Sequence, residues 1–253
     1  MTNLERRYRR LLKVLPRWYR DDREEEMVGL FLADRSDDLD LEHSWPGWGE
    51  TGAMLALAVR TRFAASHAPA TAVRLGEVAR WLAVLGMVLG LKNAVQVVYA
   101  ELVVGDGAAP QWETLLVDLS PVAVIALLVR GQRTWAKVVA GVALLPWLVR
   151  ALTDPGPAGL TSVLWQLPAL VGFVALCLGF HREAPPPARM LWWCGGAVAV
   201  GLVEMLAYGV SPVVVPAAVL CVRVFAYVRG EVALGRALAV FAVLCSPWLV
   251  VLF

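Results

Sequence analysis

From Trp81 to its last residue, the chain is a succession of apolar segments, each about 17 to 23 residues long. An α-helix of this length, rising about 1.5 Å per residue, crosses about 30 Å of hydrocarbon. Asp118 and Pro121 interrupt the second segment, and the seventh stops with the chain. The pattern predicts an all-α fold with seven membrane-spanning helices, approximately at residues 81–103, 112–129, 134–151, 160–180, 190–208, 212–228 and 233–253.

Composition agrees with a lipid environment and divides the chain in two. Hydrophobic residues make up 59% of the sequence and the mean hydropathy is +0.63, whereas soluble domains are about 45–50% apolar. Residues 1–76 nevertheless hold twelve of the 23 basic and twelve of the 21 acidic residues. We therefore predict a charged N-terminal domain with a linker, residues 1–75, and a polytopic transmembrane helix bundle, residues 76–253.

Basic residues collect in alternate loops, as expected when the cytoplasmic loops of a membrane protein carry the Lys and Arg. The loops between them offer Asp106 and Glu113, then Arg150 with Asp154, then no charge. This alternation predicts a cytoplasmic N-terminus and an outer C-terminus. The low lysine content is typical of a GC-rich bacterial gene, so the expected location is the bacterial inner membrane. The basic groups are Arg74 and Arg80; Arg130, Arg133 and Lys137; Arg182 and Arg189; and Arg229 and Arg236.

Three helices are predicted in the N-terminal domain, over residues 4–15, 17–34 and 50–65, followed by a linker over 66–75. The first is amphipathic, and the second begins with acidic residues that complement its dipole. The run at residues 24–26 is interpreted as a solvated face with short-range pairs such as Arg20 with Glu24. The expected buried positions are Leu4, Tyr8, Leu11, Leu12, Leu15, Met27, Leu30, Phe31, Met54, Leu57, Ala58 and Phe63.

Ionisable residues inside the apolar segments are the strongest candidates for function in the bundle, because such groups are costly in lipid and usually face the interior. We predict that Lys92 and Asp118 pair to fix the first two spans. Glu204 and Arg223 are expected to reach water near span ends. The alternative interpretation is a transport or ligand-sensing site. Small residues predict close helix packing at Gly86, Gly90, Gly195, Gly196 and Gly201.

Signatures of several other classes are missing from the sequence. No phosphate loop, nucleophile elbow or zinc-protease helix occurs, and the three histidines, His43, His67 and His181, are far apart. The four cysteines lie in apolar runs without metal-ligand spacing. With a net charge of +2, direct nucleic-acid binding is not expected. We predict neither an enzyme nor a cofactor or metal site.

The segment YRRLLKVLPRWYRDDREEEMVGLFLADR, residues 8–35, resembles the HAAS-type signalling domain. That domain precedes membrane spans in bacterial proteins often encoded beside PadR-family regulators. The segment is also similar to the prefix of some FtsX-like permeases, although Asp22 and Arg23 stand where the permease version often has Tyr-Gly. The matching residues are Tyr8, Leu11, Leu12, Leu15, Pro16, Tyr19, Arg20, Glu26 and Met27.

The resemblance implies an integral-membrane signalling or regulatory protein whose cytoplasmic domain engages a partner protein, with a PadR-family regulator as one candidate. Aromatic and arginine residues, which are enriched at binding hot spots, predict the docking surface. The alternative is a transporter, or a membrane subunit that serves an ABC-type ATPase. The predicted partner-binding residues are Arg17, Trp18, Arg20, Trp45 and Trp48.

Overall fold

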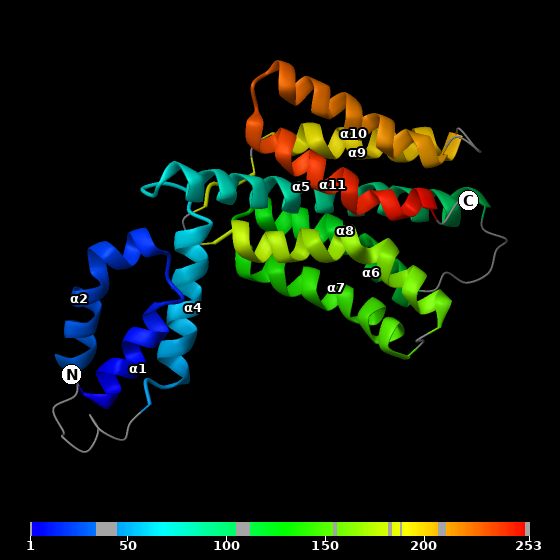
Figure 1. Cartoon of the computed structure of the whole chain (residues 1–253). Helices are drawn as coiled ribbons and strands as arrows, with labels where there is room; N and C mark the ends of the chain where they lie inside the picture. The colour runs from blue at the N-terminus through cyan, green and yellow to red at the C-terminus, as the bar shows by residue number, and fades with distance from the viewer. Residues whose placement is uncertain are drawn as a thin grey trace. The chain divides into compact units, whose positions relative to one another are not determined.

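The computed structural model describes residues 2–33, 45–104, 112–153, 156–181, 184–187, 189–206 and 211–250. Every regular element in these ranges is helical, which confirms the predicted all-α class (Figure 1). The π-helical turn η1 (Ala100–Val104) continues the long helix α5. The α-helices are α1 (Asn3–Leu12), α2 (Arg17–Ala33), α4 (Trp48–Arg62), α5 (Ala70–Tyr99), α6 (Trp112–Val129), α7 (Arg133–Thr153), α8 (Pro157–Gly179), α9 (Met190–Leu206), α10 (Ser211–Val228) and α11 (Val232–Val250).

The chain forms two compact units, Met1–Gly76 and Glu77–Phe253. The linker predicted over 66–75 is wrong in its second half, because α5 already begins at Ala70. The carbonyl oxygen of Pro69 accepts hydrogen bonds from the amides of Ala72 and Val73, at 2.9 and 3.2 Å. No helix breaker follows Pro69 within the linker, so the helix begins as soon as this first turn is closed.

The N-terminal unit has a small core in which α1 lies against α2 and α4. Tyr8 stacks on the Phe31 ring with 3.9 Å between centroids. The prediction for Leu30 is wrong, because this side chain is 69% exposed. Val28 and Phe31, three positions apart, share the face toward α1 and leave Leu30 on the other side of the helix. The buried cluster comprises Tyr8, Leu12, Leu15, Val28, Met54 and Ala58.

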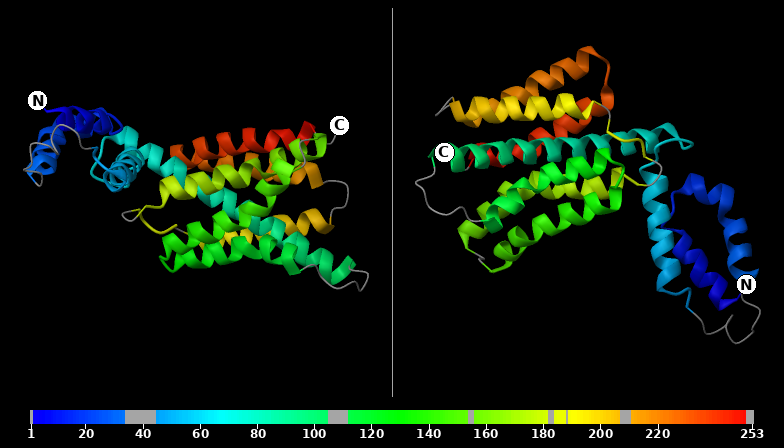
Figure 2. Two further views of the ribbon diagram at one scale, coloured as in Figure 1. Left: turned by 90° about the horizontal axis from the view of Figure 1, so that it is seen from below. Right: turned by 180° about the vertical axis from the view of Figure 1, so that it is seen from behind.

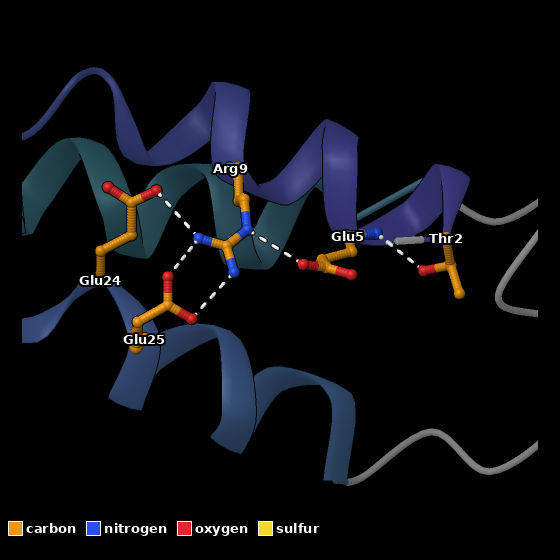
Figure 3. Close-up of polar contacts among 5 residues, drawn as sticks. All are labelled: Thr2, Glu5, Arg9, Glu24 and Glu25. Atoms are coloured by element: carbon orange, nitrogen blue, oxygen red, sulfur yellow. Dashed lines mark hydrogen bonds and ion pairs between the residues drawn. The ribbon is translucent and has the colours of Figure 1, made fainter.

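A network of ion pairs connects α1 to α2 (Figure 3). The Arg9 guanidinium donates to both carboxylate oxygens of Glu25, at 2.6 and 2.9 Å. It also donates to Glu5 at 3.0 Å and to Glu24 at 3.4 Å. The hydrogen bonds from Arg9 lower the pKa of Glu25 below its ordinary value. The acidic run is therefore partly a contact surface for α1. Its described local pair is Arg23 with Glu26, and Glu24 pairs with Arg9 rather than with Arg20 as predicted.

The second unit is built around α5, which runs between α6, α7 and α8 on one side and α9, α10 and α11 on the other (Figures 1 and 2). Two apolar clusters lie on opposite sides of this central helix. Ala83, Val84 and Met87 of α5 belong to the cluster that contains residues of α6, α7 and α8 and also Met190 of α9. Leu85 and Leu89 of α5 belong to the cluster with α10 and α11. The central helix therefore contributes to both halves of the core.

Helices α5 and α8 cross at a close approach of their backbones. A Cβ atom built on Gly86 would lie 2.8 Å from the Cα of Gly172, a separation that real side chains do not adopt. Gly90 likewise lies against Pro121 of α6. Small residues of this kind let two backbones approach in membrane helix bundles. Predicted close packing is thus observed at Gly86, Gly90 and Gly201, whereas Gly195 and Gly196 have no neighbour within 4 Å of such a Cβ.

Basic residues at the start of α7 bind the carbonyl groups that follow or end α8. Arg133 donates to the carbonyl oxygens of His181 and Ala184, at 2.8 and 2.5 Å, and Lys137 donates to that of Cys177 at 3.2 Å. The last carbonyls of a helix lack partners within it, and cations near them also complement the helix dipole. Two residues of a predicted basic loop thus also have a structural role.

Among the described helices, the continuous segment Ala70–Leu102 is long and apolar enough by itself to cross a membrane. Five shorter apolar stretches occur at Leu115–Val129, Gln166–Gly179, Met190–Leu206, Val214–Val228 and Val232–Ser246. The positions of the predicted apolar segments coincide with helices α5 to α11. The number of membrane crossings stays a prediction.

Candidate functional site

The predicted partner-binding residues lie at opposite ends of the N-terminal unit. Arg62, the last residue of α4, donates a 2.8 Å hydrogen bond to the carbonyl oxygen of Val14, three residues before α2 begins. The start of α2 therefore lies near the end of α4, whereas Trp48 starts α4, about 21 Å away along the helix axis. The structure does not bring Arg17, Trp18 and Arg20 together with Trp45 and Trp48.

Trp45 and Trp48 are the more accessible group. Their side chains are 58% and 86% exposed, although the core of the unit is formed without them. At the other end, Trp18 is half-buried and makes an edge contact with Tyr19, at 5.6 Å between ring centroids. Exposed tryptophans beside a separate core are typical of contact surfaces.

The other candidate site is a buried polar cluster inside the second unit. The Lys92 ammonium group of α5 lies 2.7 Å from Oε2 of Glu204 in α9, and the side chains are 9% and 3% exposed. Gln96, one turn after Lys92, donates to the same oxygen at 2.5 Å. The carboxylate therefore receives two donors from one face of α5. The predicted pair of Lys92 with Asp118 is wrong, and so is the expectation that Glu204 reaches water.

Local sequence explains why Glu204 reaches Lys92. Gly201 precedes Glu204 by three residues and lies on the same face of α9. A Cβ on Gly201 would be 3.1 Å from the carbonyl oxygen of Lys92, so the absent side chain lets α9 approach α5. Both helices run in the same direction in the predicted topology. Lys92 is 11 residues and Glu204 14 residues after the predicted start of its span, a depth difference of about 5 Å that two long side chains bridge.

Asp118 and Arg223, the other predicted intramembrane residues, lie elsewhere. Asp118 lines a cavity of about 140 Å³ between α5, α6, α7 and α8, together with Asn93, Ser120 and Gln166. A space of this size with several polar groups accommodates water molecules. Arg223 of α10 is exposed, and its expected contact with water near a span end stays a prediction. The ionisable residues therefore occupy three separate environments.

The Lys92 cluster combines a buried cation, a carboxylate and an amide, so its charges cancel within the site. Such a pair orients helices and is costly to break, because one partner alone leaves an uncompensated buried charge. Within the described ranges, no three His, Cys, Asp or Glu residues gather in an arrangement that could hold a metal ion. The chemistry that the cluster supports is charge compensation between α5 and α9.

Comparison of the chain with protein-family models, curated proteins and solved structures finds no match.

Proposed function

We propose that this chain is an integral membrane signalling or regulatory protein of the bacterial inner membrane. The observation that carries the membrane assignment is the polarity of the second unit, whose charged pair is inside while large apolar side chains cover its outside. Soluble proteins rarely expose contiguous apolar surfaces of this extent. Side chains at least 50% exposed on α6 to α11 include Leu116, Val142, Leu145, Leu148, Val149, Leu152, Val203, Leu206, Leu220, Val224 and Val243.

The proposed arrangement has seven spans, α5 to α11, with the N-terminal unit in the cytoplasm. It is supported by the loop charges and by the coincidence of the apolar segments with helices. The expected partners are the lipid bilayer and a cytoplasmic protein. The resemblance of residues 8–35 to HAAS-type domains makes a PadR-family regulator the first candidate for that protein.

The topology can be tested by cysteine labelling in a variant whose four native cysteines are replaced. Gln132→Cys, in the exposed turn between α6 and α7, is expected to react only after the membrane is permeabilised. Gly107→Cys, which lies outside the described residues, is expected to react in intact spheroplasts. Labelling of both positions from the same side would contradict the seven-span arrangement.

Partner engagement is assigned to the turn that carries Trp45 and Trp48, because both side chains are exposed. Aromatic anchors of this kind contribute much of the binding energy at many protein interfaces. The proposed role is that this turn docks the partner while the bundle anchors the complex or senses a condition of the envelope.

The docking assignment predicts that replacing Trp45 and Trp48 with alanine weakens binding of the partner by at least about 100-fold, as expected for hot-spot residues. The measurement is co-purification of full-length protein with the candidate regulator from detergent-solubilised membranes, followed by titration. Trp135→Ala is the matched control, because Trp135 is 62% exposed in the other unit. Equal retention by all three proteins, with circular dichroism unchanged, would favour the transporter alternative.

A further inference from the structure

A cavity with a volume of about 880 Å³ lies between α5, α9, α10 and α11 of the second unit. Its walls are mainly aliphatic and aromatic. Pockets of this size and lining accommodate apolar ligands, and apolar cavities do not hold ordered water. The wall residues that the four helices contribute include Leu85, Leu89, Ala197, Val200, Ala218, Val219, Val222, Phe225, Leu238 and Phe241.

The cavity has a cationic end. Arg189 precedes α9 and Arg229 follows α10, and both line the cavity at the end where α11 begins. The Arg229 guanidinium lies 4.8 Å from the centroid of the Phe225 ring, which is itself a wall residue. One carboxylate, Glu231, lines the same end. The end of the cavity therefore carries two arginines against one acidic group.

The depth of the cavity matches one half of a bilayer. Along α5 its lining extends from Trp81, near the cationic end, to Lys92, eleven residues further along the helix. This is about 16 Å, whereas the hydrocarbon core of a bilayer is about 30 Å thick. Lys92 is neutralised by Glu204, so the inner end adds no unpaired charge. A molecule that fills the cavity therefore has an anionic group at one end and an apolar body about one leaflet long.

We propose that this cavity binds a membrane phospholipid with an anionic headgroup, taken from the leaflet on the side of Arg189 and Arg229. In the proposed topology this is the cytoplasmic leaflet, so the inference rests on the membrane location of the bundle. Arginine guanidinium groups bind phosphate through directed, charge-assisted hydrogen bonds. The apolar wall binds the acyl chains, and the excess of one positive charge selects anionic over zwitterionic headgroups.

The test is native mass spectrometry of the full-length protein in a neutral detergent, titrated with phosphatidylglycerol or phosphatidylcholine of identical acyl chains. Phosphatidylglycerol is expected to bind about fivefold more tightly, the discrimination that one net positive charge gives near an anionic headgroup. Equal affinity for the two lipids would overturn the proposal. Equal binding of glycerol phosphate, which lacks acyl chains, would also overturn it.

Three variants test whether the phospholipid binds in this cavity. The double variant Arg189→Gln, Arg229→Gln is expected to lose the preference for phosphatidylglycerol. Arg130→Gln, Arg236→Gln removes the same charge from exposed positions outside the cavity lining and is expected to keep it. Ala218→Trp fills the cavity and is expected to weaken binding of both lipids. An equal loss in the control variant would assign the preference to overall charge and overturn the proposal.

These outcomes are separable from failure of the proposed function. Cysteine labelling tests the membrane arrangement and co-purification tests the partner, and neither depends on lipid preference. A protein with the seven-span topology that binds both phospholipids equally would retain the proposed function and refute the lipid site.

Discussion

Replacing Glu204 with leucine is expected to lower the free energy of unfolding of the purified protein by about 3 kcal/mol, because the Lys92 ammonium group loses its only described carboxylate partner. Lys92→Met is expected to cost less, since the Glu204 carboxylate keeps the hydrogen bond from Gln96. Titration with a denaturing detergent in mixed micelles, followed by circular dichroism, measures both values.

The double variant Lys92→Met, Glu204→Leu is expected to recover most of this loss, because neither member of the pair is then left as an uncompensated buried charge. The variant Asp118→Asn tests the predicted pair of Lys92 with Asp118, which the structure contradicts. It is expected to change stability by less than about 1 kcal/mol, because Asp118 lines a different cavity. Additive effects of the two single replacements would show that Lys92 and Glu204 are not coupled.

Replacing Gly86 with leucine is expected to destabilise the bundle by about 3 kcal/mol, because even its Cβ atom would lie 2.8 Å from the Cα of Gly172. The contact is with backbone, so α5 and α8 must separate along their whole crossing. The same detergent titration measures the change, and the thermal midpoint of the purified protein provides a second measurement.

Gly195→Leu is the matched control, since nothing lies within 4 Å of a Cβ at that position. It is expected to be neutral or stabilising by up to about 1 kcal/mol, the gain from replacing glycine in a helix. Equal destabilisation by the two leucines would mean that α5 and α8 do not cross at Gly86.

Helix positions could be predicted because they depend on properties that are local along the chain. Runs of apolar residues between short polar or charged loops indicated α6 to α11 closely. The start of α5 was misplaced by about eleven residues because hydropathy detects only the apolar part of a helix. Arg74, Glu77 and Arg80 occupy its first turns, where they lower hydropathy without preventing helix formation.

The pairing of ionisable residues could not be predicted by comparing neighbouring spans. Lys92 and Asp118 lie in consecutive helices, but α5 also contacts α9 through Gly201, a relation between segments 112 residues apart. The sequence did contain a usable signal. Glu204 lies three residues after a glycine. Glu204 and Lys92 also lie at nearly the same distance from the predicted starts of their spans. Similar depth in two spans of the same direction was a better criterion than adjacency along the chain.

The ion pairs around Arg9 could not be predicted from the sequence for a different reason. Three consecutive glutamates on a helix are most often solvated, and nothing local distinguishes Glu24 and Glu25 from that average. Their contact with Arg9 requires the packing of α1 against α2, which depends on Tyr8, Val28 and Phe31. The cavity between α5, α9, α10 and α11 likewise depends on how these four helices pack together. No local pattern in the sequence indicates that packing.

Because Lys92 and Glu204 are far apart along the chain, their ion pair can form only late in synthesis of the protein. Ribosomes add about 5–20 residues per second, so about 6–22 s pass between synthesis of the lysine and of its partner 112 residues later. In the proposed membrane arrangement, α5 enters the bilayer during this interval with an unpaired cation, which its flexible stem can hold only by extending toward water. Completion of α9 ends that exposure, so the chain acquires its final arrangement around α5 only after five of its seven proposed spans have been made.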